Sequence, residues 1–498
     1  MTKSKRLFLF LLLTVTLLLS LKHTWLLETR TWWAALDNDV QQISGAIALN
    51  SGEFPALSVH PSFFTKLLFG RFVKMAYIVG VIPHFDVSYF SDSNNLIMQW
   101  PCIIKLASYY SLICSIFFIM CIFVLFGLLF KSRTIAASAS LMVMGGIGVC
   151  DQMQIIRSEL LSCSFGVISW IFILCATQQL KKERLFRYLI CLFLSGFLYC
   201  WALYNKIMAY PFLAPLGFEV FRIVISSEYN ENYIKIFGKL GVYLKGKVLV
   251  LKSVVPTTVL AFGFCVSFFT PYLITYPLIG KARAWYYQKL LSTLILNPIG
   301  TTKVKVSLDL GEMLVTLNYY IEQYFSHWSV FVVFTLLFLF ARRKHLVKKS
   351  LVYGFFITYL AFFCIRGHNM VYLIYSDWLF VLSLCCILED LFERFQSEKE
   401  KRFIALALVI LFNVYHFRYS DYGDINKRFL RADISKSKGY AKMWFSSPHP
   451  YWFNRKYIMA YYKHYGFRIS PEKSHQMLEG MFSSGIFHSK TLGEVGRH

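Results

Sequence analysis

Apolar runs of about 20 residues alternate with short polar loops along most of this 498-residue chain. Runs of that length with so few charges are typical of helices that cross a bilayer, because a helix satisfies its own backbone hydrogen bonds in lipid. The pattern predicts an all-α polytopic membrane protein with about 11 transmembrane helices. They are expected near residues 7–22, 103–130, 135–150, 159–178, 186–204, 207–226, 248–275, 326–341, 351–366, 370–389 and 403–417.

The clustered Lys and Arg residues predict which loops lie in the cytoplasm. If Lys3, Lys5 and Arg6 are cytoplasmic and the helices alternate in direction, every short and strongly basic loop falls on the same side. Orientation by Lys and Arg bias requires this arrangement. The loops concerned contain Lys131 and Arg133, residues 181–187, 235–252, 342–349 and 394–402.

The opposite, outer side receives the longer loops, which are 23–102, 151–158 and 276–325, and the tail 418–498. We predict a transmembrane module over residues 1–417 and a small extracytoplasmic domain over 418–498. In the first outer loop, Lys66, Arg71 and Lys74 interrupt the apolar segment 63–80. This segment is therefore expected to form helices that lie in the membrane interface. Loop 276–325 is expected to form a flap.

Composition supports the membrane interpretation and weakens others. The chain is 56% hydrophobic and carries a net charge of +25. The basic residues lie in separate loops and form no single patch, so nucleic acid is not expected as a partner. None of the 12 Cys forms a C-x-x-C pair, which argues against a metal clip or a disulfide framework. Residues 7–21 lack a following cleavage site, so we expect an uncleaved first span.

An acidic cluster, Asp37-Asn38-Asp39, stands out in the first outer loop. Either Asp could cap an interfacial helix, because Asp is a favoured N-cap residue. A carboxylate near the membrane surface can also act as a general base and take a proton from an attacking hydroxyl. These two roles are compatible, and the sequence leaves open whether Asp37 or Asp39 would be the base.

Two further outer stretches carry charge at the mouths of predicted spans. The first contains Asp151, Arg157 and Glu159, which either pair locally or bind substrate. The second contains Lys206, on the side where lysine is otherwise scarce. Lys206 either snorkels to the interface or binds the phosphate of an anionic lipid.

A third stretch, Arg366-Gly367-His368-Asn369 followed by Tyr372, lies in a short outer hairpin. Arg366 and His368 are either interfacial anchors or groups that neutralise a departing phosphate. Together the stretches predict an outer cavity with carboxylates on one wall and cations on another. Transfer of a sugar from a polyprenyl phosphate needs this pattern, because the phosphate leaves and the acceptor hydroxyl requires a base.

The chain resembles the GT-C membrane glycosyltransferases in four stretches. The segment from Asp37 to Gly52 resembles the family's acidic first-loop motif and the helix after it. His60-Pro61-Ser62 resembles its His-Pro-Pro-Leu segment. The segment from Arg157 to Leu161 is similar to its second acidic motif, and the segment from Tyr204 to Pro211 to its Thr-Lys-Gly-Pro turn. Each match departs from the family pattern: Asp-Asn-Asp replaces Asp-Glu, Ser62 replaces a Pro, and Asn205 replaces a Thr.

The resemblance implies a GT-C fold and an inverting transfer of a monosaccharide, with glucose expected, from a polyprenyl phosphate to a glycan or glycolipid acceptor. By organisation, the serotype-converting O-antigen glucosyltransferases of lipopolysaccharide are nearest. The implied location is the bacterial inner membrane with a periplasmic site. Asp37 and Asp39 would be catalytic, and Lys206, Arg366 and His368 would bind the donor phosphate. Asp151, Arg157, Glu159, His60 and Tyr372 would bind donor or acceptor. No cofactor or metal is implied, although some relatives bind a divalent metal.

Two other functions compete with this interpretation. An O-antigen ligase or polymerase would concentrate Arg and His in a large late loop, whereas loop 276–325 has no His. A lipid or glycolipid transporter would place charges in the middle of spans and show internal duplication. Neither feature is visible in the sequence.

Overall fold

A computed structural model describes the chain over residues 3–29, 36–52, 62–85, 93–130, 132–153, 156–238, 248–296, 328–340, 374–395 and 397–419, with short pieces between 311 and 358. Every regular element in these residues is a helix, which confirms the predicted all-α class. Six of the helical segments are long and apolar enough to cross a membrane: Leu7–Thr24, Cys102–Leu129, Ser158–Lys181, Leu185–Asn205, Met208–Ile225 and Val248–Ile279. A multi-pass membrane protein is therefore supported, whereas the count of 11 spans is not confirmed.

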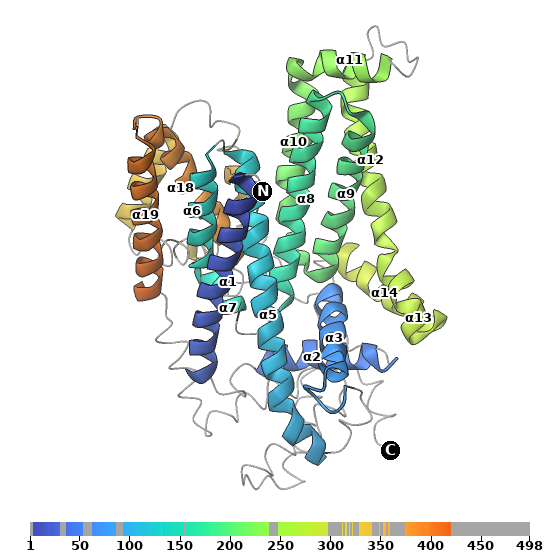
Figure 1. Ribbon diagram of the computed structural model, residues 1–498. Coiled ribbons are helices and arrows are strands. Elements are labelled where there is room, and N and C mark those ends of the chain that lie inside the picture. The colour runs from blue at the N-terminus through green and yellow to red at the C-terminus, as the bar shows by residue number, and fades with distance from the viewer. Residues whose placement is uncertain are drawn as a thin grey trace.

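The long helices stand side by side in two groups (Figure 1). One group contains α1 (Lys3–Thr29), α5 (Ser93–Leu129), α6 (Arg133–Met144), α18 (Ile374–Phe392) and α19 (Glu398–Tyr419). The other contains α8 (Ser158–Lys181), α9 (Leu185–Asn205), α10 (Leu213–Ile225) and α12 (Val248–Phe268). Contacts between α5 and α8 and between α18 and α8 join the two groups.

Small residues allow the helices of the second group to approach closely. Ser169 of α8 and Ser195 of α9 each donate a hydroxyl hydrogen bond to the other's carbonyl oxygen, at 2.7 and 2.8 Å. A Cβ at Gly196 of α9 would overlap the carbonyl oxygen of Leu260 on α12, and one at Gly263 of α12 would overlap that of Phe193 on α9. Such close backbone contact is how helices pack in lipid, where the hydrophobic effect between them is absent.

A layer of shorter helices covers the lower end of the second group in Figure 1. It contains α2 (Leu36–Asn50), α3 (Phe63–Ile78), α13 (Thr270–Ile279) and α14 (Lys281–Leu296). The N-terminus and α11 (Asn230–Gly238) lie toward the opposite end (Figure 1). Helix α3 forms within the segment predicted to be interfacial and is not one of the six candidate spans.

The remaining elements refine the predicted spans. The segment predicted as one span at 135–150 is divided into α6 and the short α7 (Ile147–Gln152), and the span at 248–275 breaks at Phe269 between α12 and α13. The segment expected to form a flap at 276–325 starts with the last residues of α13 and continues into the regular helix α14. Short helical elements η1 (Ile207–Phe212) and η2 (Ser227–Tyr229) flank α10, and α16 (Trp328–Phe340) precedes α18. Most of the predicted span 351–366 and the predicted domain 418–498, except for the last residues of α19, lie outside the described residues.

Candidate functional site

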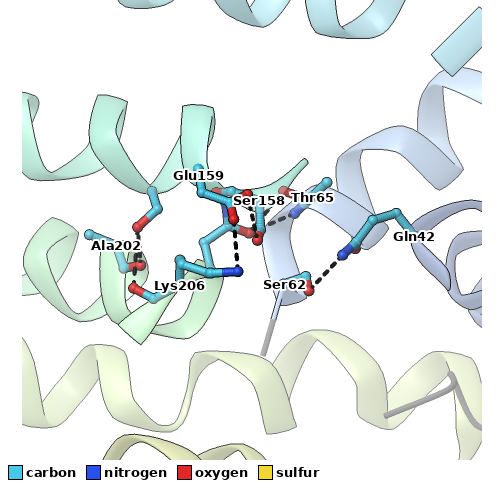
Figure 2. A network of polar contacts seen from close by, with 9 residues as sticks. Gln42, Ser62, Thr65, Ser158, Glu159, Ala202 and Lys206 are labelled. Atoms are coloured by element: carbon cyan, nitrogen blue, oxygen red, sulfur yellow. Dashed lines mark hydrogen bonds and ion pairs between the residues drawn. The ribbon is translucent and has the colours of Figure 1, made fainter. Parts of the chain in front are cut away.

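The centre of the candidate site is a buried ion pair between Lys206 and Glu159. Lys206 follows the last residue of α9 in an extended conformation, and Glu159 lies in the first turn of α8. The Lys206 Nζ lies 2.8 Å from the Glu159 Oε1, and the two side chains are only 3% and 2% exposed. Figure 2 shows this contact between the ends of the two helices. Lys206 therefore does not snorkel to the interface, and Glu159 pairs with a residue 47 positions away rather than only with its neighbours.

Asn205 attaches this ion pair to α3. Its backbone oxygen accepts a hydrogen bond from the Ser62 N–H at 2.9 Å. Its side-chain Oδ1 accepts from the Thr65 N–H at 2.9 Å and from the Thr65 hydroxyl at 3.1 Å. Its Nδ2 donates to the Ser158 carbonyl oxygen at 2.6 Å. One buried side chain thus joins the C-terminus of α9 to the N-termini of α3 and α8.

The start of α3 is also attached to α2, the helix that carries Asp37 and Asp39. Ser62, the residue before α3, has a left-handed backbone with φ of 42°. Its hydroxyl accepts a hydrogen bond from the Gln42 side chain of α2 at 3.0 Å (Figure 2). Asp39 lies three residues before Gln42 along the same helix. Hydrogen bonds therefore connect α2 to Ser62 and Ser62 to Asn205, and Lys206 is the next residue along the chain.

Lys66 of α3 is a buried cation that the sequence did not single out as part of a site. Its side chain is completely buried, and its aliphatic stem crosses Gly45 of α2, where an added Cβ would lie 2.9 Å from the lysine Cε. Burial lowers the pKa of the Lys66 amine from 10.5 to about 7, because the charged form loses its hydration. The interfacial pattern correctly predicted the helix, but not that this lysine would point into the protein.

The other predicted site residues are only partly described. Asp37 and Asp39 lie at the start of α2, and Asp151 lies in α7, but the structure describes only their backbones. Arg157 is the residue before α8 and acts electrostatically on the Glu159 carboxylate. The remaining predicted contacts lie outside the described residues: His60, Arg366, His368 and Tyr372.

A second buried carboxylate, Asp377 of α18, attaches another element near this end. Its Oδ2 accepts a hydrogen bond from the Gly148 N–H at the start of α7, at 2.8 Å. A Cβ at Gly146 would overlap the Asp377 carboxylate, so the close approach requires glycine there. Asp377 thereby holds α7, the helix that contains Asp151, against the first group of helices.

The described part of the chain offers no metal site of the usual composition. Within it, no three His, Cys, Asp or Glu side chains come together in a way that could hold an ion. The prediction that no cofactor is required remains a prediction, because Asp37, Asp39, His60 and His368 are not described at the level of side chains.

Comparisons with known proteins add little beyond this geometry. No protein-family model matches the chain, and no curated protein sequence matches it. Among solved structures, the apo oligosaccharyltransferase of Archaeoglobus fulgidus is similar, with 11% sequence identity and a TM-score of 0.47. The similarity covers 92% of this chain, which spans 60% of the length of that protein. Neither a shared fold family nor a shared activity follows from a likeness of this level.

Proposed function

We propose that this protein is an inverting membrane glycosyltransferase of the GT-C type. It would transfer a monosaccharide, with glucose as the expected sugar, from a polyprenyl phosphate to a glycan acceptor such as the O-antigen of lipopolysaccharide. Transfer would take place at the periplasmic face of the bacterial inner membrane. The observation that supports this proposal most directly is the chain of contacts from α2 through Ser62 and Asn205 to the Glu159–Lys206 pair.

These contacts support a site in which a candidate base and a candidate phosphate ligand act together. The base is Asp37 or Asp39 at the start of α2, and the phosphate ligand is Lys206 at the end of α9. Lysine is a point charge suited to a phosphate, and its low exposure strengthens its electrostatic interactions. Six helical segments are long and apolar enough to cross a membrane, and the polyprenyl chain of the donor would lie in the same membrane.

The proposed reaction needs a base, a leaving-group stabiliser and a fixed geometry between them. The carboxylate takes the proton of the acceptor hydroxyl, whose oxygen attacks the anomeric carbon. The bond from that carbon to the phosphate oxygen breaks, and the polyprenyl phosphate leaves with the electron pair. Lys206 would stabilise the charge that develops on the phosphate, together with Arg366 and His368. Asp151, Arg157, Glu159, His60 and Tyr372 would position donor or acceptor.

The test is transfer by the purified full chain from a synthetic polyprenyl-phosphate hexose to candidate acceptors, measured as release of polyprenyl phosphate. We expect Asp37→Asn or Asp39→Asn to abolish turnover, since loss of a general base typically costs about 10²–10⁴-fold. Lys206→Met should weaken donor use, because it keeps the stem and removes the charge. Glu228→Gln is a matched control. Glu228 is exposed and forms an ion pair with Lys181 at the C-terminal end of α8, whereas Glu159 lies at the N-terminal end of that helix.

Folding is checked for every variant by its thermal unfolding in detergent. Normal turnover by both aspartate variants would show that the base has been wrongly assigned. If no polyprenyl-phosphate hexose is consumed by the unaltered protein with any acceptor, the proposed activity itself is wrong.

A further inference from the structure

The Glu159 carboxylate occupies a position built for an anion. Lys206 contacts it at 2.8 Å, and Arg157 also acts on it electrostatically. The Ser158 hydroxyl donates a weak hydrogen bond to the other carboxylate oxygen at 3.4 Å. The position also lies in the first turn of the 24-residue helix α8, where the helix dipole favours negative charge.

Two cations, Lys206 and Arg157, act electrostatically on the Glu159 carboxylate. Lys206 is itself only 3% exposed, and the Glu159 carboxylate already occupies a contact with its ammonium group. An external anion that takes this contact has to replace the carboxylate.

We infer that Glu159 is an internal counter-ion of Lys206 that the phosphate of a lipid-linked substrate displaces. This inference rests on the proposed function and adds a role for a residue that would not touch the reacting atoms. In the absence of donor, Glu159 holds the Lys206 side chain in place. When the phosphate arrives, it binds Lys206 in competition with the carboxylate. Glu159 is thus a positioning residue that sets how tightly the site holds phosphate.

The retained carboxylate also discriminates between donor and product. A polyprenyl-phosphate sugar is a diester with one negative charge, whereas the polyprenyl phosphate released is a monoester with charge near −2 at neutral pH. Because like charges repel, a nearby Glu159 disfavours the monoester more than the diester. The arrangement therefore promotes release of the product, a step that limits turnover in many enzymes.

The inference predicts that Glu159→Gln strengthens phosphate binding. A residue with only a structural role would show the opposite, because its loss would loosen the site. We would measure thermal stabilisation of the full chain in detergent by farnesyl phosphate, by its methyl diester, by inorganic phosphate and by farnesol. The variants are Glu159→Gln, Lys206→Met and the double variant with both changes, which removes the two charges and keeps both shapes.

We expect E159Q to bind farnesyl phosphate about tenfold more tightly than the unaltered protein, the size of effect that one nearby charge produces when partly screened. The gain for the methyl diester should be smaller, and farnesol should show none. The double variant should lose the gain. Equal binding by E159Q and the unaltered protein would overturn the inference, as would a double variant that binds as tightly as E159Q. If E159Q does not fold at any phosphate concentration, Glu159→Ala is compared instead, because it also removes the negative charge, and an unchanged affinity in E159A overturns the inference.

The binding assay separates this inference from the proposed function. If farnesyl phosphate binding follows the predicted order but no sugar is transferred, the counter-ion role stands and the transferase proposal fails. If sugar is transferred normally but phosphate binding ignores Glu159, only the counter-ion role fails. Stabilisation of E159Q by inorganic phosphate as strongly as by farnesyl phosphate would support anion exchange and count against recognition of a lipid.

Discussion

Replacing Lys66 by Met should change how the stability of the protein depends on pH. The Lys66 side chain is completely buried between α3 and α2, and its pKa falls from 10.5 to about 7 because the charged amine loses its hydration. Met keeps the aliphatic stem that packs over Gly45 and has no group that titrates. A comparison of the two proteins across pH therefore isolates the titration of the Lys66 amine.

The magnitude and the pH range follow from the two pKa values. Each pH unit between them is worth about 1.4 kcal/mol, so titration of Lys66 changes the free energy of unfolding by about 5 kcal/mol over the whole range. Below pH 7 the amine is protonated in both folded and unfolded states, and its contribution to stability is lowest. Between pH 7 and 10.5 the unfolded state binds more protons than the folded state, so stability rises with pH. Above pH 10.5 the contribution no longer changes.

The assay is reversible unfolding in mixed detergent micelles at several pH values, for K66M and the unaltered protein. We expect the stability of the unaltered protein relative to K66M to rise by about 3 kcal/mol between pH 7 and 9.5. Lys74→Met is the matched control, because Lys74 is exposed on the same helix. A stability difference between K66M and the unaltered protein that stays constant with pH, or that changes in the opposite direction, would refute the reasoning.

Two further predictions concern the packing that supports the site. Asn205→Ala removes the side-chain hydrogen bonds to Thr65 and Ser158, and we expect it to lower the free energy of unfolding by about 2–4 kcal/mol and to reduce sugar transfer. Thr257→Ala is the control, since the exposed Thr257 hydroxyl forms a hydrogen bond only within its own helix. Equal stabilities of the two variants would show that Asn205 does not join the helices. Gly196→Ala or Gly263→Ala should force α9 and α12 apart, because the added Cβ would overlap the facing carbonyl oxygen, and should lower the midpoint of thermal unfolding. Gly217→Ala in α10 has open space around the added Cβ and should have little effect, so similar losses at all three positions would contradict the close packing.

The sequence alone predicted an all-α protein with several helices long and apolar enough to cross a membrane. Hydrophobic run lengths were enough for the helices, because a bilayer requires about 20 apolar residues per span and satisfied backbone groups. These run lengths were less reliable for the number of helices and for where each helix ends. The segment around Phe269 is apolar throughout, yet two helices, α12 and α13, meet there. The sequence indicated that Glu159 and Lys206 need partners, since charges at the mouths of spans are costly when unpaired, and the two residues pair with each other.

Only the tertiary structure decided which partners those charges find. Glu159 and Lys206 are 47 residues apart, and each had local alternatives that fitted the sequence equally well. Their pairing follows from the antiparallel packing of α8 and α9, which places the start of one helix beside the end of the other. The burial of Lys66 likewise depends on α2 packing over α3 at Gly45. Periodicity and composition describe a residue's own helix, whereas burial and ion pairing are set by the surface that packs against it, which comes from distant parts of the chain.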